Sequence, residues 1–393
     1  MKKLLILNGS ISEVTLIDKA KELGYYVITS GNAPSLIGHS HSDEYIMADY
    51  SDKEAILKIV KENNVDRIVS CANDFGVITS SYVAEKMGWP GHDSYETSVL
   101  LHQKDLFKEF IQSIGIRTPI SKPFSDKESA VEYVQNAEYP IIVKATDLTG
   151  GKGILRANNI DEALAAIDNA FNRSRVKHIV IEPFIEGEQQ TIHTFIKDKK
   201  VVSSVSNDAF SPINPYLIQA ELFPAKGIEK IQDELISFIE LICNKLNLVD
   251  GMLTLQYIVK DGKPYIIELM RRALGNQYLT VAGVMNGFPW EEALIRAETG
   301  MDLSVLKSSS PKAKFAGHHG IMATRNGIIK SYSIPPEIEA HIFKKIEMVK
   351  PGGRIDDYMN ERIAYIYYTY DNYDEALDAV LNMNKKINIE YGD

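Results

Sequence analysis

The chain has 393 residues, too many for one ordinary hydrophobic core, so two or three domains are expected. Its formal net charge of −10 argues against nucleic acid or an anionic membrane as the main partner. No apolar run in the sequence is long enough to cross a membrane. Two cysteines, Cys71 and Cys243, both lie in apolar runs, which is typical of buried thiols in a reducing cytoplasm.

Residues 1–100 alternate strand and helix patterns, as in a parallel α/β unit, and predict a Rossmann-like domain. We expect strands at residues 4–7, 26–29 and 67–71, and helices at 14–23 and 52–62. Ligands of such sheets lie at the carboxyl ends of strands, which makes Gly9, Asn73 and Asp74 candidates for ligand contact or for ordinary turn and capping roles. The absence of G-x-G-x-x-G after the first strand argues against a dinucleotide oxidoreductase.

A second region, residues 101–306, begins with an amphipathic helix at Lys104 and continues into a lid-like unit of about residues 118–186. The lid pattern is strand 141–145, a glycine-rich loop, strand 153–156, helix 161–171 and strand 178–182. Lys144 ends the first of these strands, and the loop carries Thr149, Gly150, Gly151, Lys152 and Gly153. Glycines let backbone N–H groups wrap an anion, and lysine adds positive charge. Because a strand follows Gly153, the loop differs from a Walker A motif and predicts a hairpin over a polyphosphate.

The rest of the chain predicts a long helix near residues 229–246 and a hairpin of strands 252–259 and 264–269. The serine-rich stretch 203–211 is expected to form a loop near the substrate. A linker at residues 307–312 precedes a third region, residues 312–393, with strands at 315–323 and 363–369 and a helix at 373–386. This region predicts a small α+β domain.

Five features in order resemble the ATP-grasp superfamily of ligases. They are Lys104, Lys144 with its glycine loop, V-I-E-P-F-I-E-G-E at 180–188, Gln256, and I-I-E-L-M-R-R at 266–272. Carbamoyl-phosphate synthetase, biotin carboxylase and glycinamide ribonucleotide synthetase belong to this superfamily. The resemblance implies an α/β and α+β protein, in which a Rossmann-like domain precedes an ATP-grasp core with a mobile lid and a small C-terminal α+β domain.

The resemblance also implies an ATP site. Lys104 and Lys144 would contact the α- and β-phosphates beneath the glycine loop. The adenine would meet backbone groups around Phe184 and Ile185, and Glu182 would accept from its amino group. The family's ribose carboxylate falls on Gln189, and Glu188 stands one residue earlier, so either could hold the ribose.

The metal pair implied for Mg²⁺ is Glu268 with Gln256, which stands where the family usually has an acid; Met270 replaces a usual asparagine. These two side chains flank a turn at Asp261-Gly262. A two-residue turn would place them on opposite faces, whereas a three-residue loop with a bulge would place them on one face. Shared metal ligation therefore predicts the three-residue loop.

Arg272 matches the family's arginine and would act with Lys144 in catalysis by neutralising a transferring phosphoryl group. Adjacent side chains on a strand diverge, so Arg271 is either a substrate contact or a structural ion-pair partner. Asn276 is, with Asp74, a further substrate candidate.

The function implied is an ATP- and Mg²⁺-dependent carboxylate–amine ligase of enzyme class 6 that acts through an acyl phosphate and releases ADP. Its partners would be small carboxylate and amine substrates, and a homodimer is possible. One alternative is a purine-pathway enzyme like phosphoribosylglycinamide synthetase or a related carboxylase, although no extra basic cluster for a ribose phosphate is evident in the first domain. Another is a catalytically weak nucleotide-binding regulatory protein, which Gln256 and Met270 suggest. The glycine loop and Lys144 argue against a structural protein that binds no ATP.

Overall fold

The N-terminal domain is a parallel sheet covered by helices, as predicted. The structure is a computed structural model that describes residues 1–148 and 153–392. The sheet has the order β3-β2-β1-β4, and its four strands are Glu44–Met47, Tyr26–Gly31, Lys3–Leu7 and Arg67–Val69. The helices of this domain are α1 (Val14–Glu22), α2 (Lys53–Glu62) and α3 (Asp74–Met87), with the short 3-10 helix η1 (Ile37–Ser40). Leu4 to Leu7 are fully buried, because helices cover both faces of a parallel sheet.

Helix α3 begins at Asp74 because Asn73 caps it. The Asn73 side chain accepts a hydrogen bond from the Phe75 N–H, so one of the unpaired donors of the first turn is satisfied. This cap holds Asp74 at the carboxyl end of β4, where the domain meets the rest of the chain. Helices α4 (Tyr95–His102) and α5 (Lys104–Ser113) then lead away from the domain.

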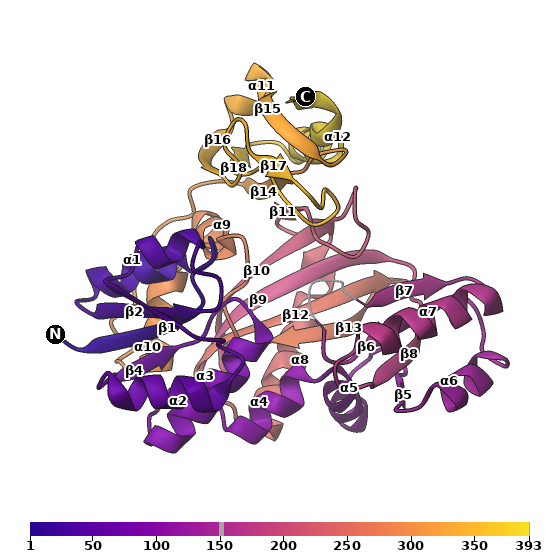
Figure 1. The fold of residues 1–393 in the computed structure, drawn as a ribbon, viewed down its shortest axis with the longest axis horizontal. Helices are drawn as coiled ribbons and strands as arrows, with labels where there is room; N and C mark the ends of the chain where they lie inside the picture. The colour runs from indigo at the N-terminus through magenta and orange to yellow at the C-terminus, as the bar shows by residue number, and fades with distance from the viewer. Residues whose placement is uncertain (149–152, 393) are drawn as a thin grey trace.

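The lid is an antiparallel sheet of order β5-β8-β6-β7 with two helices on one face, at the right of Figure 1. Its strands are Lys122–Phe124, Ile179–Pro183, Ile141–Ala145 and Ile154–Ala157, and its helices are α6 (Lys127–Val134) and α7 (Ile160–Arg173). The predicted strands and α7 are confirmed; α6 was not predicted. An apolar cluster that includes Val143 and Ile181 packs beneath the helices, so the alternate side chains of the strands face the other way.

One large sheet runs through the second and third regions, with the order β13-β12-β9-β10-β11-β14-β18-β16. Its strands are Lys263–Met270, Gly251–Lys260, Glu188–Lys197, Lys200–Phe210, Ala220–Phe223, Phe315–Ile321, Ala364–Tyr370 and Ile342–Glu347. Helix α8 (Gln232–Lys245), after the short 3-10 helix η2 (Ile228–Lys230), packs on one face, and α9 (Tyr278–Asn286) and α10 (Trp290–Thr299) contribute to the core on the other. The predicted loop at 203–211 is wrong: these residues lie almost entirely in β10, which pairs with β9 and β11.

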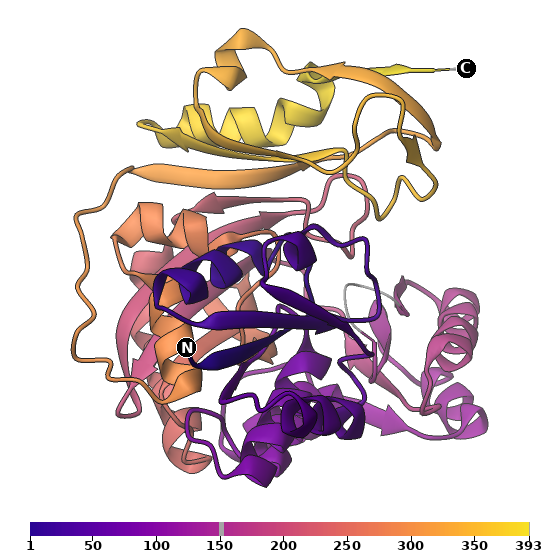
Figure 2. The ribbon, with the colours of Figure 1, turned by 60° about the vertical axis from the view of Figure 1, so that its left-hand side comes forward.

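The C-terminal region lies above the rest of the molecule and shares its large sheet (Figures 1 and 2). Its remaining elements are β15 (Gly327–Ser333), α11 (Pro336–Glu339), β17 (Arg354–Ile355), α12 (Tyr373–Lys386) and β19 (Asn388–Tyr391). The predicted linker has no helix or strand, but it is held to the end of α9 because the Ser309 N–H donates to the Gly287 carbonyl. Among the described helices, none has both the length and the apolar character to span a membrane.

Candidate functional site

Lys144 and Glu182 form a buried ion pair on the face of the lid that is turned away from its helices. They extend from the adjacent strands β6 and β8, and Lys144 Nζ donates to Glu182 Oε2 at 2.6 Å. Burial alone would raise the pKa of Glu182, but Lys108 and Lys144 lower it below its usual value. A lysine that ends an apolar strand needs an anionic partner, and Glu182 supplies it here, an ion-pair role that the sequence did not predict.

Lys108, which the sequence analysis missed, is the second cation beside Glu182. It lies on α5 with 2% exposure of its side chain, and its Nζ is 3.8 Å from Glu182 Oε1. The same nitrogen donates to Thr118 Oγ1 at 2.7 Å and to the Ile266 carbonyl at 3.1 Å. Burial lowers the pKa of Lys108 to about 8. The sequence feature that could have identified Lys108 was its spacing. It follows Lys104 by four residues on one helix, so the two lysines lie on the same face.

Lys104 joins the base of the glycine loop to strand β13. Its Nζ donates to the Leu148 carbonyl at 2.7 Å and lies 3.6 Å from Glu268 Oε1. Lys104 is thus no freely solvated surface lysine, since its side chain is 15% exposed. The predicted phosphate contacts of Thr149, Gly150, Gly151 and Lys152 lie outside the described residues, whereas Gly153 is described and has φ +68°, a conformation that favours glycine.

Gln256 and Glu268 are directly opposite each other on strands β12 and β13, and therefore on one face of the sheet. The predicted three-residue loop is wrong, because Lys260 pairs with Lys263 around a two-residue turn at Asp261-Gly262. A register shift between Gln256 and Tyr257 restores the alignment. In the described part of the chain, no group of three His, Cys, Asp or Glu side chains is arranged to hold a metal ion. This pair would therefore need phosphate oxygens or water to complete a Mg²⁺ site.

The hinge after the lid begins at Phe184, just beyond the end of β8. The Phe184 N–H donates to the Pro140 carbonyl at 3.0 Å. Arg156 of β7 lies with its guanidinium carbon 4.3 Å from the Phe184 ring centroid and pairs with Glu186 at 2.9 Å. Beside the hinge is an open cavity of about 510 Å³. It is lined by Pro140, Phe184, Glu186, Gly187 and the 259–261 turn.

The alternation of strand β9 separates the two ribose candidates. Thr191 of β9 lies opposite Gln256 of β12, so these two side chains share a face of the sheet. Gln189 is two residues before Thr191 on the same strand and therefore points to that face too, which also carries Glu268. Glu188 belongs to the opposite face. Of the two predicted residues, Gln189 is therefore the one placed on the face of the metal pair.

Arg272 forms an ion pair with Asp74 across the junction with the N-terminal domain. Arg272 Nε lies 2.5 Å from Asp74 Oδ1, and both side chains are largely buried. Burial alone would raise the pKa of Asp74, but Arg272, His102 and Lys104 lower it below its usual value. The sequence analysis proposed Asp74 and Arg272 separately, and the fold brings them together. The sequence analysis did not identify His102, for which the only indication was its position two residues before Lys104.

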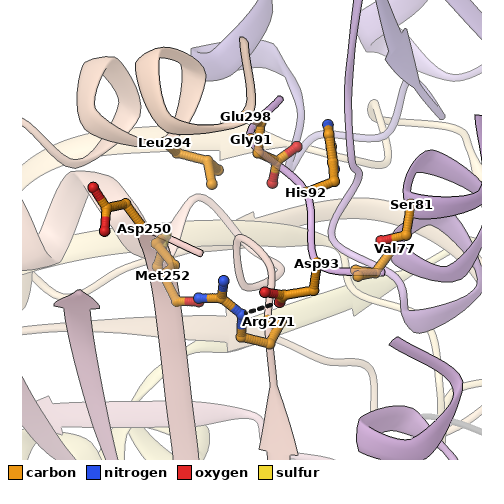
Figure 3. Close-up of a pocket in the computed structure, with 11 residues that line it drawn as sticks. Val77, Ser81, Gly91, His92, Asp93, Asp250, Met252, Arg271, Leu294 and Glu298 are labelled. Atoms are coloured by element: carbon orange, nitrogen blue, oxygen red, sulfur yellow. Dashed lines mark hydrogen bonds and ion pairs between the residues drawn. The ribbon is translucent and has the colours of Figure 1, made fainter. Parts of the chain in front are cut away.

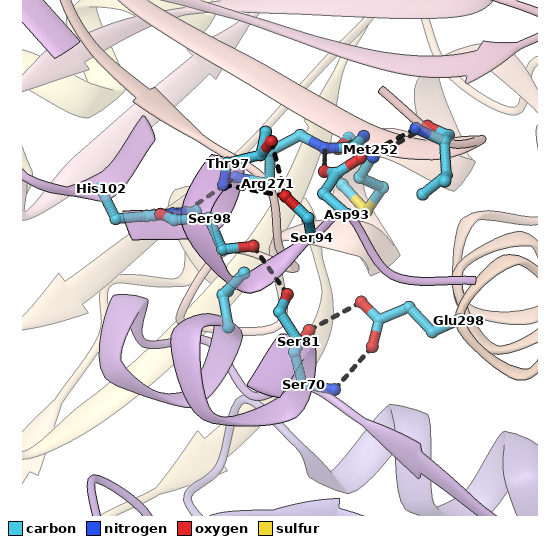
Figure 4. Close-up of polar contacts among 12 residues, drawn as sticks. Ser70, Ser81, Asp93, Ser94, Thr97, Ser98, His102, Met252, Arg271 and Glu298 are labelled. Atoms are coloured by element: carbon cyan, nitrogen blue, oxygen red, sulfur yellow. Dashed lines mark hydrogen bonds and ion pairs between the residues drawn. The ribbon is translucent and has the colours of Figure 1, made fainter. Parts of the chain in front are cut away.

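Arg271 points the other way, as predicted, although both arginines lie just beyond the end of β13 at Met270. Its Nε donates to Asp93 at 2.8 Å (Figure 3). Its terminal nitrogens donate to the Met252 carbonyl at 2.6 Å and the Val249 carbonyl at 2.8 Å. A cavity of about 20 Å³, room for one water, lies beside this pair. Ser70 binds Glu298 in the same junction (Figure 4). All three guanidinium nitrogens of Arg271 donate within the protein, which favours the ion-pair alternative over the substrate contact.

Asn276 lies in a strained turn that joins three parts of the molecule. Asn276 and Gln277 both have positive φ, 61° and 52°, which is unfavourable for residues with side chains. The Asn276 N–H donates to Ser12 Oγ of the N-terminal domain, and its carbonyl accepts from the Tyr367 hydroxyl of the C-terminal region. Such strain, held from both sides four residues after Arg272, is typical of functional sites.

Comparison with known proteins accounts for this arrangement. Residues 102–213 match the sequence model of the phosphoribosylglycinamide synthetase ATP-grasp (A) domain. This part of the chain, which includes the lid, is therefore similar to an ATP-grasp domain. A phosphoribosylamine–glycine ligase of Fusobacterium nucleatum is 27% identical over 196 residues, which are 45% of this chain and 45% of that protein. The match therefore spans less than half the length of that relative.

Solved structures with different reactions share the ATP-grasp fold. The L-amino acid ligase from Bacillus licheniformis has a TM-score of 0.81 at 18% identity, with 100% of this chain and 99% of that chain covered. The biotin carboxylase domain of Hydrogenobacter thermophilus 2-oxoglutarate carboxylase, in complex with MgADP, has a TM-score of 0.78 at 19% identity, with 99% and 91% covered. At these identities the likeness shows the fold alone.

Proposed function

We propose that the chain is an ATP-dependent carboxylate–amine ligase that forms a C–N bond through an acyl phosphate and releases ADP and phosphate. The observation that carries this proposal is a cluster in which four cationic side chains from α5, the lid and the segment after β13 face three carboxylates. Its members are Lys104, Lys108, Lys144, Arg272, Asp74, Glu182 and Glu268. The surplus of positive charge suits a polyphosphate and the charge that develops during phosphoryl transfer.

The residues of this cluster divide between binding and chemistry. Lys104 and Lys144 would bind the ATP phosphates, and Glu182 would hold Lys144 in place until the nucleotide arrives. Arg272 would stabilise the transferring phosphoryl group and the acyl phosphate, with Asp74 holding its guanidinium. Exclusion of water by a closing lid would protect the acyl phosphate from hydrolysis.

Glu268 and Gln256 would hold Mg²⁺, because one carboxylate and one amide oxygen share a face and Mg²⁺ accepts its other ligands from phosphate and water. The metal would neutralise charge on the ATP phosphates when bound. The adenine would lie at Phe184 and Ile185 of the hinge, and Gln189 would reach the ribose from the face it shares with the metal pair.

The substrates would be a small carboxylic acid and a small amine, placed between the core and the N-terminal domain by Asp74 and Asn276. The strained turn at Asn276 and its tie to Ser12 support this placement. A homodimer remains a prediction.

A purine-pathway reaction is the second candidate, and the match of residues 102–213 to a phosphoribosylglycinamide synthetase domain favours it. A weakly catalytic nucleotide-binding protein is the third, and the single carboxylate of the metal pair favours that one.

The test is ATP turnover with Mg²⁺ and pooled amino acids, small acids and amines, with ADP and AMP measured separately. We expect ADP formation that requires both an acid and an amine, with a new amide mass. AMP as the product would contradict the acyl-phosphate route, and no turnover with any mixture would favour the regulatory alternative. The variant Arg272→Met is the control, because it should retain nucleotide binding and lose ADP formation.

A further inference from the structure

The carboxyl end of β1 is where a parallel sheet of this order would place a phosphate. Strand β1 lies between β2 and β4, so the strand order reverses beside it, and ligands of such sheets bind at this switch point. A glycine after the first strand commonly allows close approach of a phosphate. Gly9 stands at that position, two residues after the end of β1. A substrate that carries a ribose phosphate would therefore be expected here.

The carboxylate of Glu13 already fills this crevice. Its Oε2 accepts from Ser10 N at 2.8 Å, Ser10 Oγ at 2.7 Å and Asn8 Nδ2 at 3.1 Å, and its Oε1 accepts from Ala72 N at 2.9 Å. These donors come from the segments that follow both β1 and β4, and all of them are uncharged. Glu13 is 0% exposed. Burial raises the pKa of Glu13 above its usual value, and the hydrogen bonds that Ala72 and Ser10 donate to it oppose this shift.

The space above Gly9 is closed as well. The Gly38 N–H of η1 donates to the Gly9 carbonyl at 2.7 Å, and a Cβ atom on Gly9 would lie 2.3 Å from Nδ1 of His39. His39 is fixed by Thr29 Oγ1 at 2.9 Å and by the Tyr45 ring, whose centroid is 4.0 Å away. The missing side chain of Gly9 thus makes room for an imidazole of the same domain, and no ligand is needed to explain it.

We propose that Glu13 is a built-in anion that occupies the anion crevice of the N-terminal domain, so that the amine substrate carries no phosphate. This inference rests on the proposed ligase function. It favours a carboxylate–amine ligase with small substrates over an enzyme that acts on a phosphoribosyl compound. A phosphoribosyl group would meet a carboxylate that already uses the neutral donors, and like charges repel. A small amine without phosphate meets no such conflict, and Asp74 offers it a carboxylate at the same edge of the sheet.

Anion binding by the full chain tests the proposal without any turnover. Wild type, Glu13→Ala and Glu13→Gln are saturated with Mg²⁺ and a non-hydrolysable ATP analogue, so that the nucleotide site is filled. Thermal unfolding is then followed against sodium formate and inorganic phosphate, with sodium chloride at equal ionic strength as the blank. We expect Glu13→Ala to have a lower Tm than wild type and to show a saturable rise of about 2 °C or more with either anion. Wild type and Glu13→Gln should follow the blank.

Two results would overturn the proposal: a rise in the Tm of wild type equal to that of Glu13→Ala, or no response of Glu13→Ala to either anion. If Glu13→Ala does not fold, titration of wild type with ribose 5-phosphate, followed by ³¹P NMR, decides. No saturable shift is expected, and a saturable shift would overturn the proposal. If the proposal about Glu13 fails, the ligase function is still tested separately by the assay of ADP formation.

Discussion

Two adjacent arginines make the same kind of bond in two different junctions. Arg271 pairs with Asp93 and Arg272 pairs with Asp74, and both aspartates come from the segment before α5. The Arg271 guanidinium also donates to two core carbonyls and is 5% exposed, whereas the Arg272 side chain is 12% exposed and has one further acceptor, the Ala273 carbonyl, among the described residues. All three guanidinium nitrogens of Arg271 donate, whereas Nη2 of Arg272 has no partner among the described residues. An arginine bonded through every nitrogen fixes the domains, and one with a nitrogen left over can bind a phosphoryl group.

The largest effect should come from breaking the Arg271 junction. Arg271→Met would leave the buried Asp93 carboxylate without its cation and remove a donor from two carbonyls, and we expect the free energy of unfolding to fall by about 3–5 kcal/mol. Urea denaturation measures it. The matched control, Arg272→Met, should lose less, because Asp74 keeps Lys104 and His102 as electrostatic partners. Equal losses in the two variants would refute the division of roles.

In turnover, we expect Arg272→Met to have a larger effect than Arg271→Met, the reverse of their order in stability. Arg272→Met would remove a cation from the site of phosphoryl transfer, and we expect kcat to fall by about 10²- to 10³-fold. The affinity for ATP, measured by calorimetry, should stay close to wild type. Folded Arg271→Met protein should keep most of its kcat, and a comparable fall in that variant would mean that Arg271 also acts on the substrate.

A smaller effect should follow from the pH dependence of the Asp74–Arg272 pair. The pKa of Asp74 is lowered in the folded protein, so its ionised form contributes stability above its ordinary pKa of 3.8, and this stability is lost as the pH falls through the lowered value. The stability difference between wild type and Asp74→Asn should therefore be present at neutral pH and shrink in acid. Urea titrations at several pH values measure it; a difference independent of pH would contradict the ion pair.

The smallest effect concerns the metal pair. Gln256→Glu would add a second carboxylate opposite Glu268, and we expect the Mg²⁺ concentration for half-maximal turnover to fall by up to about tenfold, or 1.4 kcal/mol. Gln189→Glu is the matched control, since the same change on the same face should alter the KM for ATP instead. A Mg²⁺ requirement unchanged in Gln256→Glu would remove Gln256 from the metal site.

Local patterns in the sequence predicted most of the fold. The lid strands follow from apolar runs, and α3 was missed although Asn73 is an ordinary N-cap residue. The divergence of Arg271 and Arg272 was predicted from strand alternation, and it is found although both residues lie just beyond the end of β13. Strand β10 was mistaken for a loop because its serines and Asn207 suggest a turn, whereas pairing with β9 and β11 satisfies its backbone.

Features that depend on register or on domain contact were not predictable from one sequence. The bulge that aligns Gln256 with Glu268 leaves no local signal in an apolar strand. The placement of Lys108 against Glu182 joins residues far apart in the chain, and that of Glu13 against Ala72 depends on how the segments after β1 and β4 pack. The sequence therefore predicted which residues belong to the candidate site, and the structure showed which of them contact one another.

The transfer of oxygen from the acid to phosphate tests the central claim most directly. Once an acid and an amine that support turnover are known, the acid is labelled with ¹⁸O in its carboxylate, and the products are examined by ³¹P NMR. The acyl-phosphate route predicts ¹⁸O in inorganic phosphate, with ADP as the nucleotide product. Label in AMP, or phosphate without label, would contradict the account.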